Sequence, residues 1–273
     1  MTDETLADVQ RKLESITRKW WFFALFVLLT FVPPYTSKTY DWMEGGFNWM
    51  ESPTGQIILG ALQNTLAIAI VWPVFQVIPV ILVISLVFIG NKVVRLVSVY
   101  GAISYVLFAF LQSTAVTEKF GFGIATSNLA MILMAATFWA WEAIVVENDF
   151  TPRKQPTWKF WVVPLAFLAF WFPMNPDTLM PDFNPAYFLT SRSGLYFCNM
   201  TPVYLAILTL YWPRVNMATL RVTSLVGVFI GFSTMLVFFL WFPTVLWWNG
   251  VLHIPLFTIS IYGLVLSLRK RSS

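Results

Sequence analysis

The sequence predicts an all-α polytopic membrane protein with eight transmembrane helices, a 4+4 parallel internal repeat and both termini in the cytoplasm. Three observations lead to this prediction: the apolar composition, the placement of Lys and Arg, and a likeness between the two halves of the chain. Of the 273 residues, 58% are hydrophobic and 11% are charged, whereas a soluble domain carries about 25% charged residues. So much apolar surface does not fit into a water-soluble core, so we expect the chain to lie in a membrane.

The first segment, residues 1–19, predicts an amphipathic helix at the cytoplasmic face of the membrane. Leu6, Val9, Leu13 and Ile16 recur at helical spacing and form one apolar stripe. The segment mixes acidic and basic residues and has no small-residue cleavage site before a short apolar core, so it does not resemble a signal peptide.

Eight later segments are apolar over about the 20 residues that a transmembrane helix needs. They lie near 20–37, 74–91, 96–114, 124–146, 158–174, 195–213, 222–242 and 245–268. With both termini inside, three of the 17 Lys and Arg fall on outer segments, namely Lys38, Lys119 and Arg192. The remainder lie on cytoplasmic segments, which is the positive-inside pattern of a plasma (inner) membrane protein.

The spans divide the chain into two units of four. The first unit, 20–146, contains an inserted segment near 56–72, which we expect in the outer interface; nine spans is the alternative if this segment crosses. A cytoplasmic linker at 147–157 leads to the second unit, 158–268, and a basic cytoplasmic tail follows at 269–273.

The two units share four short blocks in the same order, which predicts the internal repeat. The paired blocks are 18–34 with 158–173, 76–88 with 199–211, RLVSVYG at 95–101 with RVTSLVG at 221–227, and Asn128/Thr137 with Asn249/Thr258. Four spans per unit give both units the same orientation, related by a pseudo-twofold axis along the membrane normal. Parallel repeats of this kind often place a substrate or ion path between the halves.

Polar residues inside the predicted spans are the candidates for such a path, because buried polar groups are costly in lipid. Gln76 pairs with Asn199 in the repeat, Asn128 pairs with Asn249, and His253 lies one turn from Asn249. We expect these residues to line an outward-facing polar cavity. The alternative is that the amides hydrogen-bond between helices and hold the bundle together.

Prolines break the hydrogen-bond ladders of two paired spans. Pro79 and Pro202 lack an N–H and leave free the carbonyl four residues earlier, and Pro73 with Pro79 brackets Gln76. Such helix breaks can build a binding site, or Pro73 can mark a plain turn.

Two arginines end paired spans on the cytoplasmic side. Arg95 and Arg221 are each followed by a Ser one turn later. They predict either a symmetric gate or anion site, or topology anchors that extend to the headgroups.

Glu142 is the one carboxylate near the end of a long apolar run, FWAWEAIVVEND at 138–149. Asn128 and Ala135 share its helical face, so we expect the side chain to point into the bundle, where it could carry a proton or bind a cation. The alternative is a Glu that reaches the headgroups or pairs with Arg95 or Arg221.

These features favour a transporter or permease for a small molecule or ion, with a non-enzymatic subunit or anchor of a larger membrane complex as the alternative. The sequence has no P-loop, paired-acid motif or Ser/His/Asp set, so an enzymatic role is the weakest hypothesis. One His and one Cys predict no metal site and no cofactor. The expected partners are the lipid bilayer, the transported substrate and possible partner subunits, and not nucleic acid, because the basic residues flank apolar runs.

Overall fold

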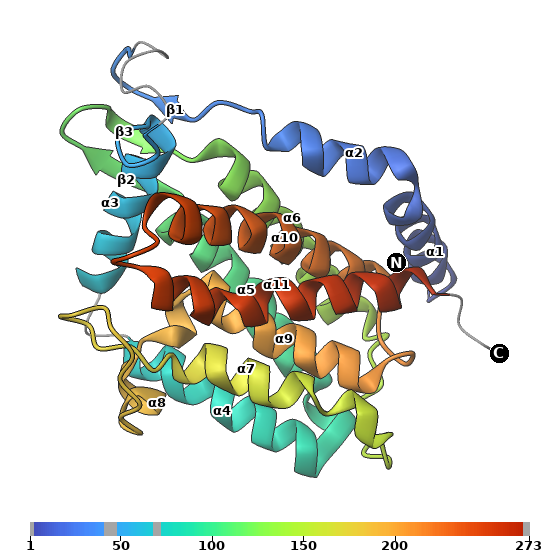
Figure 1. Cartoon of the computed structure of the whole chain (residues 1–273). Helices are drawn as coiled ribbons and strands as arrows, with labels where there is room; N and C mark the ends of the chain where they lie inside the picture. Colours follow the sequence, from blue (N-terminus) through green and yellow to red (C-terminus); the bar gives the residue numbers. More distant parts are fainter. Residues whose placement is uncertain (1–2, 41–47, 68–71, 270–273) are drawn as a thin grey trace.

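The computed structural model describes residues 3–40, 48–67 and 72–269. Residues 68–71 of the predicted insertion and 270–273 of the predicted tail lie outside this part. Helices dominate and run roughly side by side along one direction (Figure 1). Both termini lie at one end of the bundle, and a small sheet with α3 (Pro53–Ala67) and α8 (Tyr187–Thr190) lies at the opposite end. We call these the basic end and the sheet end.

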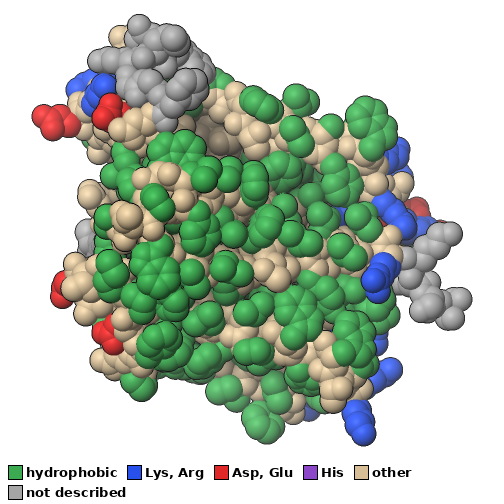
Figure 2. Space-filling view, in the orientation of Figure 1, with side chains coloured by type: hydrophobic (Ala, Val, Ile, Leu, Met, Phe, Trp, Pro, Cys, Tyr) green, Lys and Arg blue, Asp and Glu red, His purple; other side chains and the backbone are tan. Residues whose placement is uncertain are grey.

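The outer surface of the bundle is suited to lipid. Figure 2 shows hydrophobic side chains across the broad face, whereas Lys and Arg gather at the basic end. Trp20 and Phe88 each expose 80% of their surface, and Phe31 exposes 77%. Large side chains exposed at this density would be a liability in water. The surface therefore agrees with a protein embedded in a membrane.

Among the described residues, four helical segments are long and apolar enough to cross a membrane, and up to five if a bent pair counts as one. The four are Pro73–Leu111, Thr126–Val145, Met217–Trp241 and Trp247–Leu268; the bent pair joins Tyr187–Leu195 to Phe197–Tyr211 at 93°. They contain α4 (Trp72–Ile89), η1 (Gly90–Val93), α5 (Val94–Leu111), α6 (Thr126–Val145), η3 (Ser193–Leu195), α9 (Phe197–Tyr211), α10 (Met217–Leu236), the π-helix η4 (Val237–Trp241) and α11 (Trp247–Leu268).

The longest segment, Pro73–Leu111, folds back on itself at η1. Gln76 near its start and Gln112 just after its end both hydrogen-bond within residues 188–197. Asn91 in η1 instead donates to Asp149, at the basic end. The segment is therefore an antiparallel hairpin of two 18-residue helices.

Two of the predicted full-length helices are much shorter than expected. Within the predicted spans 20–37 and 158–174, α2 covers Trp20–Leu29 and α7 covers Val162–Trp171, ten residues each. Pro33 and Pro173 follow shortly after, and a proline disfavours helical geometry in the residue before it. The residue before Pro173 is Phe172, which adopts a left-handed conformation with φ 50°. A short 3₁₀ helix, η2 (Thr157–Lys159), precedes α7.

The fold is also not purely helical. A three-stranded antiparallel sheet in the order β1–β3–β2 closes the sheet end, from β1 (Tyr35–Thr36), β2 (Thr114–Thr117) and β3 (Gly121–Ile124). The β-branched residues Thr114, Val116 and Thr117 and the turn at Gly121 (φ 67°) suit a hairpin. These residues were predicted to be span ends and loop, so the prediction of an all-α chain was too strict.

The inserted segment forms α3, which packs on β2 at the sheet end. Ile57 and Ala61 of α3 are fully buried beside Ala115 and Ala125. In the main core, α5 packs along α6 and α10 packs along α11. Helix α1 (Asp3–Arg18) lies across the basic end, against α10, α6 and α2.

Candidate functional site

Glu142 lies on the last turn of α6 and is fully buried. The chain leaves α6 through Val146, which has a left-handed conformation with φ 53°, and turns back over the carboxylate. The backbone N–H of Asn148 donates to Glu142 Oε1 at 2.8 Å. Asn216 Nδ2 donates to Oε2 at 2.8 Å. Glu142 therefore points into the bundle as expected, but it pairs with amides and not with Arg95 or Arg221.

Asn216 connects this carboxylate to the start of α10. It is the N-cap residue, and its Oδ1 accepts from the backbone N–H groups of Ala218 and Thr219 at 3.1 Å each. The backbone N–H of Asn216 donates to Asn148 Oδ1 at 2.8 Å. Capping satisfies helix donors, and the positive end of the helix favours a nearby carboxylate. This local geometry gives Glu142 a favourable place despite its burial.

Helix α1 joins the same network through Gln10. Gln10 Nε2 donates to Asn216 Oδ1 at 3.0 Å, and Trp141 Nε1 donates to Gln10 Oε1 at 2.6 Å. The helix thus docks with a polar face, while Val9 and Ile16 of the predicted apolar stripe stay partly exposed. We call Gln10, Trp141, Glu142, Asn148 and Asn216 the basic-end latch.

Arg221 extends this docking and is only 2% exposed. Its Nη1 donates to Thr17 Oγ1 at 2.6 Å and to the Glu14 carbonyl at 3.2 Å, and its Nη2 donates to the Ser267 carbonyl at 2.6 Å. The guanidinium thereby holds the C-terminal ends of α1 and α11, where carbonyls attract a cation. Arg95 is exposed, so the two repeat-paired arginines occupy different environments.

A second charged cluster lies beside the latch in the linker. Asp149 accepts from Thr151 N–H at 2.9 Å, from Asn91 Nδ2 at 2.7 Å and from Arg214 Nη1 at 2.8 Å. Hydrogen bonds from Thr151, and with them those from Asn91 and Arg214, hold the pKa of the Asp149 carboxyl well below its usual range. The cluster fastens η1 to Asp149 and Thr151.

At the sheet end, Gln76 and Asn199 both meet the short turn around Ser193. Gln76 Nε2 donates to the Phe188 carbonyl at 2.7 Å, and Gln76 Oε1 accepts from Gly194 N–H at 3.0 Å. Asn199 Nδ2 donates to the Ala169 carbonyl at 2.9 Å and to Ser193 Oγ at 3.2 Å. We call these contacts the sheet-end clasp. Both amides are hydrogen-bonded between helices, as the alternative expectation held, and neither is presented to an open cavity.

Gln112 belongs to the same clasp and was missed in the sequence analysis. Its Nε2 donates to the Leu195 carbonyl at 2.7 Å, and its Oε1 accepts from Phe197 N–H at 3.2 Å. The sequence feature that could have identified Gln112 is an amide at the end of an apolar run. Asn216 was missed too, although an Asn just before an apolar helix is an N-cap signal.

The other predicted outer residues do not join this cluster. His253 Nδ1 lies 2.7 Å from the Asn249 carbonyl, beside the rings of Phe172 and Phe238. Asn249 Oδ1 is buried without a hydrogen-bond partner among the described residues. Asn128 is half-buried in the first turn of α6. The sequence predicted one cavity lined by all of these residues. The structure instead separates Gln76 and Asn199 from Asn249 and His253, and Asn128 lies with neither pair.

The prolines that were predicted to break helices do not interrupt them. Pro73 lies in the first turn of α4, Pro79 lies inside α4 and Pro202 lies inside α9. The carbonyl of Phe75, which Pro79 leaves without its helical donor, receives Tyr100 Oη at 3.5 Å. A Cβ on Gly194 would lie 1.8 Å from the Phe75 oxygen, so only glycine allows this close approach.

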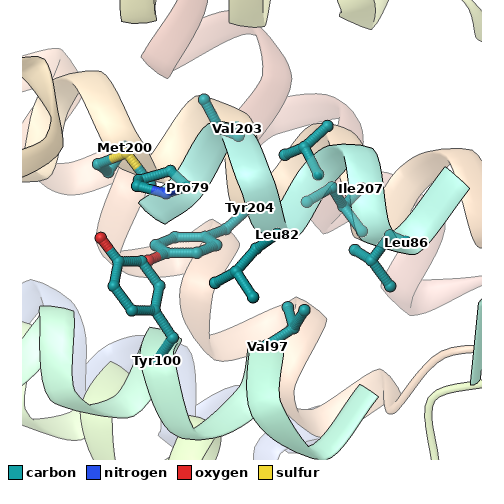
Figure 3. Close-up of a pocket in the computed structure, with 10 residues that line it drawn as sticks. Pro79, Leu82, Leu86, Val97, Tyr100, Met200, Val203, Tyr204 and Ile207 are labelled. Atoms are coloured by element: carbon teal, nitrogen blue, oxygen red, sulfur yellow. The ribbon is translucent and has the colours of Figure 1, made fainter. Parts of the chain in front are cut away.

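Between α4, α5 and α9 lies an apolar cleft (Figure 3). Its lining is Pro79, Leu82, Val83, Leu86, Val97, Tyr100, Met200, Val203, Tyr204 and Ile207. Because α4 and α5 belong to the first half and α9 to the second, the cleft lies on the seam between the halves.

Within the described ranges, no group of three or more His, Cys, Asp or Glu is placed to hold a metal ion. Comparisons with protein-family models, characterised proteins and solved structures found nothing that matches this chain. The latch, the clasp and the cleft are the features of the structure that bear on function.

Proposed function

We propose that this protein is a membrane transporter or permease for a small molecule or ion, with its path along the seam between the two halves. One observation carries the proposal: each end of the seam is closed by buried hydrogen bonds that cross from one half to the other. Glu142 and Asn216 close the basic end, and Gln76 with the 188–194 segment closes the sheet end. Hydrogen bonds can be exchanged for water at a net cost of about 1 kcal/mol each, so such closures can open.

The proposed topology has eight crossings with both termini in the cytoplasm. Contacts at the ends of successive segments support this topology. Residues 20–36 run from near Leu268, which accepts from Arg18, to the sheet at Tyr35. The α7 region runs from Lys159, which donates to the Trp212 carbonyl, to Trp171 beside Asn184. The α4–α5 hairpin counts as two crossings, and α6, α9, α10 and α11 supply the rest.

The orientation follows from the charges. Arg18, Arg214 and Arg221 make their hydrogen bonds at the basic end. Lys and Arg side chains gather there (Figure 2), and cytoplasmic segments are enriched in Lys and Arg. This puts the latch inside and the clasp outside in a plasma (inner) membrane.

Equivalent helix contacts support the 4+4 repeat. Gly101 and Gly227 are paired at an offset of 126, and the Asn128–Asn249 block has an offset of 121. A Cβ on Gly101 would lie 2.7 Å from Trp139, and a Cβ on Gly227 would lie 2.1 Å from Ser260. Trp139 and Ser260 are themselves 121 residues apart. The α5/α6 and α10/α11 pairs thus approach each other at matched positions.

The symmetry is incomplete elsewhere. Helix α7 packs on α9 and α11, whereas α2 packs mainly on α6 and α10. Glu142 also has Gly263 as its repeat mate, so the ionisable group belongs to one half. We propose Glu142 as the coupling group, because a carboxylate whose partners are two neutral amide donors can gain a proton or a cation when the latch opens.

Substituted-cysteine labelling tests the path without knowledge of the substrate. In a Cys198→Ala background, Ser193→Cys places a thiol in the clasp and Ala218→Cys places one beside the latch; both positions are fully buried. A transporter should expose the first thiol to an impermeant maleimide from outside and the second from inside. Ala109→Cys, in the core at 0% exposure, is the unreactive control, and Glu118→Cys is the exposed one. Thiols at 193 and 218 that remain as unreactive as the thiol at 109 would contradict the proposal.

A non-enzymatic subunit of a membrane complex is the alternative. Native mass spectrometry of the protein extracted gently from its own membrane separates the two. A small molecule bound at fixed stoichiometry supports the transporter, and a stoichiometric protein partner without a ligand supports the subunit.

A further inference from the structure

His253, the single histidine of the chain, lies near the sheet end of α11 and is 7% exposed. Helix α11 begins at Trp247 at the sheet end (Figure 1), so His253 is about 9 Å along the helix from that end. The centre of its ring lies 6.5 Å from that of Phe172 and 5.2 Å from that of Phe238. Phe172 has a left-handed backbone (φ 50°), and Phe238 belongs to the π-helix η4. Two irregular backbone segments therefore meet at this ring, and such segments are frequent at functional sites.

The hydrogen bond of His253 determines which ring nitrogen can take up a proton. Nδ1 lies 2.7 Å from the backbone carbonyl oxygen of Asn249. A carbonyl oxygen only accepts hydrogen bonds, so Nδ1 carries the hydrogen of the neutral ring. The lone pair is then on Nε2, and no hydrogen bond to Nε2 is found among the described residues. Nε2 is therefore the proton acceptor.

The surroundings of His253 suit the charged ring as well. Asn249 lies one turn earlier on the same face of α11, and its Oδ1 is a buried acceptor without a partner among the described residues. The ring of Phe238 is within the distance at which an aromatic ring attracts a cation. Among the described residues, no charged side chain acts on the imidazole. An imidazolium would thus meet acceptors and an aromatic ring and no competing cation.

The last turn of α7 connects His253 to the sheet-end clasp. Asn199 of the clasp donates to the Ala169 carbonyl at 2.9 Å. Phe172, which follows the same helix, contacts the ring of His253. A charge gained by His253 therefore acts on the helix end that the clasp holds.

His253 and Glu142 are ionisable groups of different halves and opposite ends. Glu142 has Gly263 as its repeat mate, and His253, at the same offset of 121, has Ile132. An imidazole takes up protons but not alkali-metal ions. Both carboxylate oxygens of Glu142 accept from amide N–H groups, which are not ligands for a cation. A proton is the one ion that suits both groups.

We propose that His253 is a proton-binding site at the sheet end, that Nε2 takes up a proton from the outer side, and that the proton is the coupling ion of the transporter. Proton uptake and opening of the clasp favour each other, because such coupling is reciprocal. Glu142 is the corresponding proton site at the basic end. The coupling rests on the proposed function, whereas proton binding at Nε2 does not.

Nuclear magnetic resonance tests the binding site directly. Nitrogen-15 histidine labels one ring in the full chain, provided that the protein is made without a histidine tag and studied in lipid nanodiscs. We expect the Nδ1–H tautomer at about pH 8, and Nε2 should take up a proton as the pH is lowered to about 4. The opposite tautomer, or an Nε2 that remains wholly unprotonated at the lowest pH in the folded protein, would overturn the proposal.

A matched pair of variants tests the second acceptor. Asn249→Leu removes Oδ1 and should weaken proton binding at Nε2 about three- to ten-fold, which is the worth of one net hydrogen bond. Asn128→Leu changes the repeat mate in the other half and should leave the titration unchanged. Equal titration curves for the two variants would overturn the role of Oδ1. The wild-type titration tests the proton site whether or not Asn249→Leu folds.

Thiol labelling at several external pH values tests the coupling. The reactivity of Ser193→Cys from outside, divided by that of the exposed thiol in Glu118→Cys, should rise as the external pH falls. His253→Gln should abolish this dependence. A ratio that does not change with pH would overturn the proton as the coupling ion. If His253 titrates but the thiol at 193 is unreactive at every pH, the proposed path fails and the proton site remains.

Discussion

The two ends of the bundle are closed by different chemistry. At the sheet end, the neutral amides of Gln76, Gln112 and Asn199 bond mainly to backbone groups of the 188–197 turn and to Ala169. At the basic end, the closure uses ionisable side chains, Glu142 and Arg221, and a separate helix, α1. The comparison shows that the sheet-end clasp is held by neutral amides alone, whereas the basic-end latch can respond to charge.

Removing Arg221 should produce the largest effect, because it breaks the contacts that hold α1 and α11 together. We expect Arg221→Met to lower the free energy of unfolding by about 2–4 kcal/mol, since it leaves buried acceptors unpaired. The measurements are thermal unfolding in detergent and hydrogen exchange of α1. Arg95→Met removes an exposed guanidinium and should change stability by less than about 0.5 kcal/mol. Similar losses in the two variants would show that burial of Arg221 is not what distinguishes it.

Glu142→Gln should have the next largest effect on stability. An amide has only one acceptor oxygen, so it cannot accept from both Asn148 N–H and Asn216 Nδ2 in the present geometry. The expected loss is about 1–3 kcal/mol. The double variant Glu142→Gln/Asn216→Asp reverses donor and acceptor and puts an aspartate at the N-cap of α10, which helices favour. It should recover at least half of the loss. Without any recovery, the direct Glu142–Asn216 bond would not be the link between the halves.

At the sheet end, Gln76→Leu should cost less, about 1–2 kcal/mol, and should loosen the clasp locally. Faster hydrogen exchange in residues 187–195, with α1 unchanged, is the expected result. Gln63→Leu, an exposed amide on α3, is the control. If Gln76→Leu loosened α1 as well, the two ends would be coupled and not independent.

How much of the fold and of the candidate site could be predicted from the sequence depends on how far apart in the sequence the interacting residues lie. Apolar composition and helical spacing predicted the helices and the inward direction of Glu142, because both are local properties. The partner of Glu142 is Asn216, 74 residues away, and no local pattern specifies such a contact. The clasp was half predicted, since the repeat singled out Gln76 and Asn199 but not their shared turn at Ser193.

The wrong expectations also have physical causes. The spans 20–37 and 158–174 were predicted from apolar composition. Composition alone does not show that Pro33 and Pro173 end the helices early. The small sheet was missed because its strands have two to four residues each, too short for a period-2 pattern. Of the two alternatives for Arg221, the topology anchor placed it at the headgroups, but α1 covers it. Docking of a surface helix by its polar side cannot be recognised from an apolar stripe.

The smallest effect should come from Asp149, which tests whether charge matters at the basic end outside the latch. Its side chain is 35% exposed in its pair with Arg214, so Asp149→Asn should cost less than about 1 kcal/mol at pH 7.

The hydrogen bonds to Asp149 lower its pKa in the folded state. Its contribution is therefore fully present above the unfolded pKa of about 3.9 and is lost as the pH falls through the lower folded value. The difference in unfolding temperature between wild type and Asp149→Asn should stay constant from pH 7 to pH 5 and shrink below about pH 4. Asp177→Asn at the sheet end should show no such difference, and a difference for Asp149 that already vanishes by pH 5 would mean that the carboxyl is not held ionised by its partners.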